Sequence, residues 1–263
     1  MKKQPQKKIQ SDFETTCPPQ MPLIGDKAPA FEAETTKGLI RFPDDYQGRW
    51  VILFSHPADF TPVCTTEFIM FANLLEDFKH MNAELIGLSV DSLSSHIAWL
   101  YAIEQEVNFN GHKNVKIDFP LIADLSTTIA RKYGMLHPSA STTKAVRAVF
   151  FIDPNGIVRT ILYYPASTGR NFSEIKRILS SLQLTDTYGV STPANWWPGD
   201  DVIVPNPSTL EEAVAAYDRN AKSTEVWFLS LQPMTELEEK KTTTSQKKSS
   251  KTISKNKKST GKR

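Results

Sequence analysis

The sequence predicts an α/β fold in which a mixed central sheet is flanked by helices. Strand-like and helix-like patterns alternate along the middle of the chain, the longest apolar runs have the length of strands, and one strong turn joins two strands late in the sequence. The chain has 263 residues, 40% of them hydrophobic, which is enough for one large domain with an appendage. Because no stretch of about 18 apolar residues occurs, we expect no transmembrane helix and no membrane partner.

The first part of the alternation predicts two strands and two helices. Residues 50–55 are apolar and β-rich, which suits a strand buried on both faces. Residues 65–80 repeat apolar side chains at helical spacing and predict an amphipathic helix. A second strand is expected over 84–90 and a second helix over 93–107. The residues at helical spacing in the second helix are Ile97, Leu100, Tyr101 and Glu104.

The second part of the alternation contains the hairpin. The sequence Asp-Pro-Asn-Gly at 153–156 is a strong turn signal between two apolar runs, so the flanking strands should pair antiparallel. The elements expected here are a strand over 119–123, a helix over 126–133, strands over 146–152 and 157–163, and a helix over 172–182.

Composition divides the chain into four parts. We expect a disordered extension over 1–20, a main domain over 21–184, a smaller extension over 185–235 and a basic disordered tail over 236–263. In the smaller extension we expect short strands over 202–204 and 225–231 and a helix over 210–217. This extension has little bulk to bury its apolar side chains, which predicts packing on the main domain or on a second subunit. Those side chains are Trp196, Trp197, Val202, Ile203, Val204, Trp227, Phe228 and Leu229.

The net charge of +2 conceals an uneven distribution. Residues 1–10 and 240–263 together carry fourteen Lys or Arg and no acid, which leaves −12 for residues 11–239. An acidic folded part is atypical of a nucleic-acid-binding domain. The basic tail is either a solubilising segment or a nuclear-import or polyanion-binding tail. We therefore expect a cytoplasmic protein, with nuclear import through the tail as the second option.

Cysteine and histidine usage limits the cofactor chemistry. Two cysteines cannot form a disulfide framework, and with five scattered histidines they do not form a Cys-rich zinc site. A reducing compartment is therefore favoured over secretion. The sequence has no glycine-rich phosphate loop and no Asp, Glu and His cluster with metal spacing, so we expect no cofactor and no metal.

Cys64 is the first candidate for chemistry because it lies where a buried strand leads into an amphipathic helix. Unpaired N–H groups at a helix start favour a thiolate, which is the nucleophilic form of cysteine. Pro57 and Pro62 restrict the loop, and Thr61 brings a hydroxyl group close to the sulfur. Taken alone, a cysteine at a helix start is more often a small buried apolar residue.

The segments around Cys64 change that balance. The spacing Pro57-x-x-x-Thr61-x-x-Cys64 resembles the peroxidatic motif of the peroxiredoxins, and the fuller segment over 54–67 resembles their 1-Cys subfamily. Further similar segments are 144–153, 164–172 and 193–196, in the order of the family. The resemblance extends from about Leu23 to Pro233. It implies a thioredoxin-like fold with a C-terminal dimerisation extension, a homodimer or larger homo-oligomer, and a role in antioxidant defence and redox homeostasis.

The resemblance also implies a reaction. Cys64 would attack hydrogen peroxide or an organic hydroperoxide and become a sulfenic acid, while Thr61 and Arg147 orient the peroxide and Pro57 shapes the loop. Arg147 is a permanent cation within an apolar strand, an expensive place for a charge without a role. Three further residues are supporting candidates: His56, Glu67 and Arg170. Glu67 and Arg170 would complete a charge network around Arg147. His56 either helps with positioning or protonation or is a hydrogen-bonded histidine at the end of the strand.

No resolving cysteine is evident in the C-terminal extension, so we expect reduction of the sulfenic acid by an external thiol, either glutathione or a thioredoxin-type protein. Cys17 as an internal partner is the less favoured option. Some 1-Cys relatives have a phospholipase activity ascribed to a Ser, His and Asp triad, but Arg49, Pro43 and Asn155 occupy those places here. The alternative function is a non-catalytic holdase or scaffold, or a polyanion-binding protein that acts through the basic tail.

Overall fold

The computed structural model describes residues 21–220, 226 and 228–235, in two compact units that meet in the sequence after Arg170. The expected disordered segments 1–20 and 236–263 lie outside the described residues, as does Cys17. The boundary between the units lies before the last long helix, Phe172–Tyr188, whereas the sequence places the start of the extension at residue 185, within the last turn of that helix.

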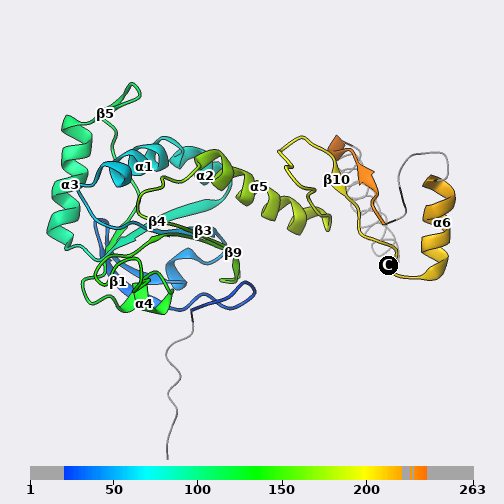
Figure 1. The fold of residues 1–263 in the computed structure, drawn as a ribbon, viewed down its shortest axis with the longest axis horizontal. Helices are drawn as coiled ribbons and strands as arrows, with labels where there is room; N and C mark the ends of the chain where they lie inside the picture. The colour runs from blue at the N-terminus through cyan, green and yellow to red at the C-terminus, as the bar shows by residue number, and fades with distance from the viewer. Residues whose placement is uncertain (1–20, 221–225, 227, 236–263) are drawn as a thin grey trace, which may run out of the picture. The chain divides into compact units, whose positions relative to one another are not determined.

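The first unit is built on a seven-stranded mixed sheet with the strand order β2-β1-β7-β4-β3-β8-β9 (Figure 1). Strand β3 is parallel to β4 and antiparallel to β8, and β4 is parallel to β7. The predicted mixed sheet is therefore confirmed. The strands are β1 (Phe31–Thr35), β2 (Gly38–Phe42), β3 (Trp50–Ser55), β4 (Ala83–Ser89), β7 (Leu121–Ala123), β8 (Arg147–Ile152) and β9 (Val158–Tyr164).

The two central strands β3 and β8 are buried along their whole length, as their apolar composition predicts. Their register pairs Phe54 with Val149, which brings the end of β3 beside the start of β8. Ser55 fixes this point, since its hydroxyl donates to the carbonyl of Val146 at 2.6 Å and accepts from the N–H of Ala148 at 3.1 Å. The end of β3 and the start of β8, about ninety residues apart in the sequence, thus lie side by side at one end of the central strands.

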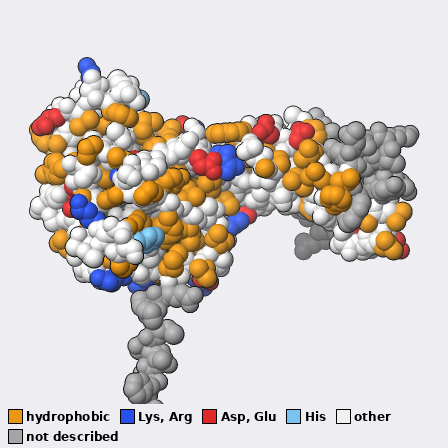
Figure 2. Space-filling view, viewed as in Figure 1, with side chains coloured by type: hydrophobic (Ala, Val, Ile, Leu, Met, Phe, Trp, Pro, Cys, Tyr) orange, Lys and Arg blue, Asp and Glu red, His pale blue; other side chains and the backbone are white. Residues whose placement is uncertain are grey.

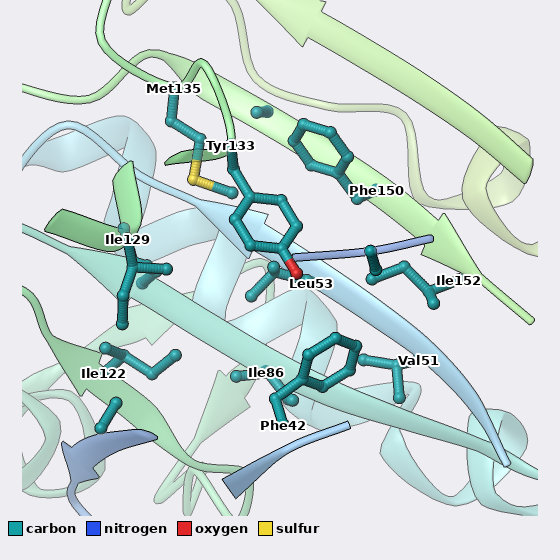
Figure 3. Packing of buried hydrophobic residues seen from close by; sticks show 14 of the residues in the cluster. Phe42, Val51, Leu53, Ile86, Ile122, Ile129, Tyr133, Met135, Phe150 and Ile152 are labelled. Atoms are coloured by element: carbon teal, nitrogen blue, oxygen red, sulfur yellow. The ribbon is translucent and has the colours of Figure 1, made fainter. Parts of the chain in front are cut away.

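Helices cover both faces of this sheet. Phe54 of β3 stacks on Phe71 of α1 (Pro62–Asn73), with ring centroids 4.0 Å apart. The neighbouring Leu53 points to the opposite face and belongs to a buried cluster with Ile129 of α4 (Thr128–Lys132). Figure 3 shows this cluster around the ring of Tyr133. Alternation along one strand therefore directs Phe54 to the face under α1 and Leu53 to the face under α4.

The helix predicted over 65–80 is two helices. Helix α1 begins earlier, at Pro62, because a proline is well suited to the first helical turn. The chain then bends at Leu74, with φ −98° and ψ 4°, before α2 (Leu75–His80). No glycine or proline marks this bend, so spacing alone could not locate it.

Helix α3 (Leu93–Glu106) forms as predicted, but it buries a different face. Ile97 and Tyr101 are exposed, whereas His96 and Trp99 are fully buried. The side-chain oxygen of Ser92 caps the helix by accepting from the N–H of Ser95 at 3.2 Å. On the inner face of α3, the polar side chain of His96 is therefore buried where the sequence pattern predicts Ile97.

Four short strands were not predicted. Strands β1 and β2 pair antiparallel as a hairpin at the sheet edge, and β5 (Asn108–Phe109) pairs with β6 (His112–Lys113). The predicted helix over 126–133 and strand over 119–123 are shorter in the structure, as α4 and β7. None of the helices in the described part of the chain is long and apolar enough to cross a membrane.

The second unit begins with α5 (Phe172–Tyr188), which runs six residues beyond its predicted end. Asn171 caps its start, and Gly189 ends it in the left-handed conformation with φ 66°. The other elements are β10 (Val202–Ile203), α6 (Leu210–Asn220) and β11 (Leu231–Gln232). Of the strand predicted over 225–231, the structure places only the last residue in a strand, while residues 225 and 227 lie outside the described part.

The expectation that the apolar side chains of the extension lack an internal core is wrong for Trp196. Trp196 is 1% exposed and packs with Val190 and Val202 in a small core of the second unit, whereas Trp197 is 48% exposed. Several other apolar side chains of this unit do reach the surface, as Figure 2 shows by their colour. They include Leu210, Val214, Phe228, Leu229 and Leu231.

Candidate active site

Cys64 lies in the first turn of α1 and is fully buried. Thr61 precedes the helix in an extended conformation, with φ −107° and ψ 143°, and its carbonyl accepts from the N–H of Thr65 at 3.0 Å. The sulfur is therefore near the positive end of the helix dipole, as the sequence predicts. Cys64 is the free cysteine in the described part of the chain.

The side chain of Arg147 reaches Cys64 from the start of β8. Its Nη1 lies 3.3 Å from Sγ of Cys64 and also donates to Oε2 of Glu67 at 2.7 Å. Its Nε and Nη2 both donate to the carbonyl of Ala166, at 3.2 and 2.7 Å. The backbone carbonyl of Ala166 thus holds one side of the guanidinium group, and Nη1 on the other side faces the sulfur.

Glu67 connects the two arginines of the site. Its Oε1 accepts from the N–H and the Nε of Arg170, each at 2.9 Å, and its Oε2 accepts from Nη2 of Arg170 at 2.6 Å. The remaining Nη1 of Arg170 donates to two backbone carbonyls at the ends of β3 and β8, each at 3.1 Å. All three charged side chains are at most 2% exposed at their side chains, so the network is shielded from solvent.

The charges of this cluster balance only if Cys64 is ionised. Arg147 and Arg170 contribute two positive charges and Glu67 one negative charge. A thiolate on Cys64 supplies the fourth charge, and buried charges are stable when they are paired. The arrangement can therefore hold a nucleophilic sulfur beside a cation that also faces any oxygen bound to that sulfur.

Thr61 and Pro57 lie in the loop between β3 and α1. The hydroxyl of Thr61 donates to the carbonyl of Ala58 at 2.8 Å, so its oxygen lone pairs remain able to accept a hydrogen bond. Pro57 is buried, while Phe60 is 60% exposed and adopts a left-handed φ of 55°. The loop is thus tightly turned on the way to Cys64.

His56 belongs to a second buried hydrogen-bond network, which it forms with Asp59 and His96. Its Nε2 lies 3.0 Å from Oδ1 of Asp59, and Oδ2 of Asp59 lies 2.8 Å from Nδ1 of His96. Burial lowers the pKa of His56 by more than the hydrogen bond to Asp59 raises it. Burial also raises the pKa of Asp59, but hydrogen bonds from the two histidines outweigh it and leave that pKa well below its usual range.

Asp59 and His96 were not among the predicted site residues. Asp59 lies within the segment 54–67 that resembles the peroxiredoxins, and a carboxylate so soon after a buried strand was the signal available in the sequence. His96 is 37 residues away in the sequence and could be found only from the fold.

Among the described residues, one group could offer atoms to a metal ion within 4.8 Å of one another. The group consists of His56, Asp59 and Asp91. These carboxylates are already engaged, because Oδ2 of Asp91 accepts from the N–H of Asp59 and from the hydroxyl of Ser89. The hydrogen bonds explain the cluster without an ion.

The three residues at the places of the phospholipase triad do come together. Arg49, Pro43 and Asn155 line a pocket of about 480 Å³. Arg49 donates to Oε1 of Glu84 at 2.6 Å, and none of the three has a side chain that can act as a nucleophile. The geometry therefore gives no support to a serine-type hydrolase at this pocket.

Two family models match the chain. The AhpC/TSA family model matches residues 24–161, and the model for the C-terminal domain of 1-Cys peroxiredoxin matches residues 181–220. A peroxiredoxin of Methanosarcina mazei is 59% identical over 221 residues, which are 82% of this chain and all of that protein. A peroxiredoxin of Aquifex aeolicus is 52% identical over 204 residues, covering 74% of this chain and 89% of that protein.

Solved structures agree with the sequence matches. A yeast mitochondrial 1-Cys peroxiredoxin, described for thiol resolution through the glutathione and thioredoxin systems, is 40% identical with a TM-score of 0.68 over 81% of this chain and all of that one. A cysteine-to-serine mutant of peroxiredoxin 6 from Arenicola marina is also 40% identical, with a TM-score of 0.65 over 73% of this chain and 88% of that one. Matches in sequence, in both parts of the chain and in fold show that this chain belongs to the peroxiredoxin family and is a thiol peroxidase.

Proposed function

We propose that the chain reduces hydrogen peroxide and organic hydroperoxides by a 1-Cys mechanism centred on Cys64. The thiolate attacks one peroxide oxygen, the O–O bond breaks, and the other oxygen leaves with a proton as water or an alcohol. Cys64 is left as a sulfenic acid. The observation that carries this proposal is the 3.3 Å approach of Arg147 Nη1 to Sγ of Cys64 in a charge-balanced, buried cluster.

Each predicted site residue then has a physical role. Arg147 stabilises the thiolate and the charge that develops on the departing oxygen. Thr61 accepts a hydrogen bond from the peroxide, because its own proton is committed to Ala58. Glu67 and Arg170 hold Arg147 in place through paired hydrogen bonds. Pro57 restricts the loop, and His56 anchors its start.

The reductant in this proposal is an external thiol, either glutathione or a thioredoxin-type protein. Glutathione would condense with the sulfenic acid to give a mixed disulfide and water, and a second thiol would release Cys64. Support comes from the absence of a second cysteine within the described residues. The yeast relative is described with these same reductant systems.

We also propose that the chain forms a homodimer or larger homo-oligomer through its second unit. Support comes from the exposed apolar side chains of that unit, including Leu210 and Phe228, which are 81% and 56% exposed. A cytoplasmic location, with nuclear import through residues 240–263, is proposed from the basic tail. Fluorescent fusions with and without that tail test the location, since nuclear signal that persists without the tail contradicts it.

The test of the function is peroxide consumption with glutathione or thioredoxin as the electron source. Cys64→Ser should abolish turnover, and Cys17→Ser serves as the matched control because it removes the other thiol. A scaffold or holdase would consume no peroxide in either form. Turnover that survives in the Cys64→Ser variant would contradict the proposal.

A further inference from the structure

The buried hydrogen bonds around Asp59 determine which protons its neighbours carry. His96 is 0% exposed, and its Nε2 lies 3.1 Å from the carbonyl oxygen of Ile122. A carbonyl oxygen accepts hydrogen bonds and cannot donate them, so Nε2 carries a proton. The other ring nitrogen, Nδ1, faces Oδ2 of Asp59 at 2.8 Å. Because that carboxylate is also an acceptor, Nδ1 carries a proton as well, and the ring is an imidazolium.

His56 has the opposite state. Its Nε2 donates to Oδ1 of Asp59 at 3.0 Å, while its Nδ1 is buried and has no hydrogen-bond partner. A second proton on that nitrogen would be a buried donor without an acceptor, which is costly. The ring centroids of His56 and His96 are 6.3 Å apart, so a second positive charge would also be repelled. His56 is therefore neutral, in agreement with its lowered pKa.

This network fixes the loop that carries the peroxide-facing residues. Asp59 lies in the middle of the segment 57–61, and its carboxylate binds His56 at the end of β3 and His96 on α3. Its backbone N–H donates to Oδ2 of Asp91, which follows β4, at 3.0 Å. Asp91 is the second carboxylate in this network, after Asp59. One side chain and its own N–H thus tie the loop to three separate elements.

Helix α3 makes a second contact on the far side of the loop. Nε1 of Trp99 donates to Oγ1 of Thr65 at 3.2 Å, one residue after Cys64. Trp99 and His96 lie one turn apart on α3, and both are buried. The helix therefore contacts the chain both before and after the segment that ends at the nucleophile.

We propose that Asp59 and His96 form a buried ion pair whose role is to position the segment 57–61, so that both are positioning residues for peroxide reduction. Neither touches Cys64 in the described contacts, and they act through the conformation of Thr61 and the start of α1. The inference rests on the proposed role of Cys64 for its effect on activity, but the ion pair itself is a property of the resting protein.

The first test reads the protonation of His96 directly in the unaltered, reduced protein. Two-dimensional ¹⁵N NMR of the histidine rings at pH 7 should show two protonated nitrogens for His96. For His56 it should show a protonated Nε2 and a bare Nδ1. The variants His96→Gln and His56→Gln assign the signals. A bare nitrogen on His96 at pH 7 would overturn the ion pair, whatever the peroxidase assay gives.

The second test measures single-turnover oxidation by hydrogen peroxide in Asp59→Asn, His96→Gln and the double variant. Each single change should slow oxidation, by up to about 10²-fold for a loop displaced by about 1 Å. The double variant should be slowed by less than the product of the two single effects, because it leaves no unpaired buried charge. The exposed His80→Gln is the matched control and should react at the parent rate.

Several results would count against the inference. Single variants that oxidise within about twofold of the parent rate, or a double variant slowed by the full product, would overturn the positioning role. If a single variant fails to fold, the NMR signals of the unaltered protein still decide the ion pair, and a double variant that oxidises within about twofold of the parent rate overturns the positioning role. An unaltered protein that does not react with peroxide would contradict the proposed function, and the ring signals of His96 would still report on the ion pair.

Discussion

Replacing Arg147 with glutamine should slow the attack of Cys64 on peroxide by about 10²–10³-fold. The substitution removes the cation 3.3 Å from the sulfur and leaves a buried cluster of one arginine, one glutamate and one thiolate. The net charge of that cluster becomes −1 when the sulfur is a thiolate, so the attacking sulfur loses its nearest positive charge. The departing oxygen also loses its donor.

The size of this effect follows from the geometry. Two unit charges 3.3 Å apart interact by about 5 kcal/mol at an effective dielectric constant of ~20. Part of this energy offsets the desolvation of Arg147, and part is shared with Glu67, which lies 2.7 Å from the same nitrogen. A net loss of about 3–4 kcal/mol remains, which agrees with the loss of one preorganised donor.

The assay is stopped-flow single-turnover oxidation of the reduced protein, which separates attack on peroxide from the later thiol steps. Arg147→Lys should fall between parent and glutamine variant, because lysine keeps the charge but cannot hold Ala166 and Cys64 with a planar fork. The exposed Arg131→Gln is the matched control. An unchanged oxidation rate in Arg147→Gln would refute the reasoning.

Four further outcomes are expected. Cys17→Ser should keep most turnover with an external thiol, and turnover lost in a coupled assay would point to Cys17 as an internal partner. High peroxide with limiting reductant should convert Cys64 to sulfinic acid, seen as a mass gain of two oxygens on its peptide, and an unmodified peptide would indicate a fast hidden resolver. Ending the chain after Gly189 should disturb assembly and activity because it removes the small core of the second unit, whereas ending it after Glu239 should spare both. Light scattering and turnover assays test this, and an active monomer from the shorter chain would contradict it. Because burial lowers the pKa of His56, the free energy of unfolding should fall as pH falls below about 6.5, by up to ~1.4 kcal/mol per pH unit. Urea unfolding should show a flatter dependence of stability on pH for His56→Gln than for the parent, and equal dependences would contradict this prediction.

Local patterns were sufficient for the parts of the fold that local chemistry determines. The apolar run over 50–55, the turn at 153–156 and the start of a helix at Cys64 each depend on neighbouring residues, and each is found in the structure. The roles of Thr61 and Arg147 came from resemblance, and the structure adds the distance between Arg147 and the sulfur.

The features that sequence patterns did not reveal depend on contacts between distant segments. The inner face of α3 is set by the partners of His96, which are Asp59 and the backbone of Ile122, so the apolar spacing of Ile97 was misleading. Trp196 is buried in a small core with Val190 and Val202, and Met234 from the far end of the extension also packs against that core. Burial of this kind depends on tertiary packing, which overrides local propensity.

The most direct test of the central claim is to trap the sulfur after a single equivalent of peroxide. Reduced protein is mixed with hydrogen peroxide, quenched with a sulfenic-acid-specific reagent and digested for mass spectrometry. The label should appear on the Cys64 peptide, in step with peroxide lost, and should fall when glutathione or thioredoxin is added. Peroxide consumed without any modification of Cys64 would contradict the account.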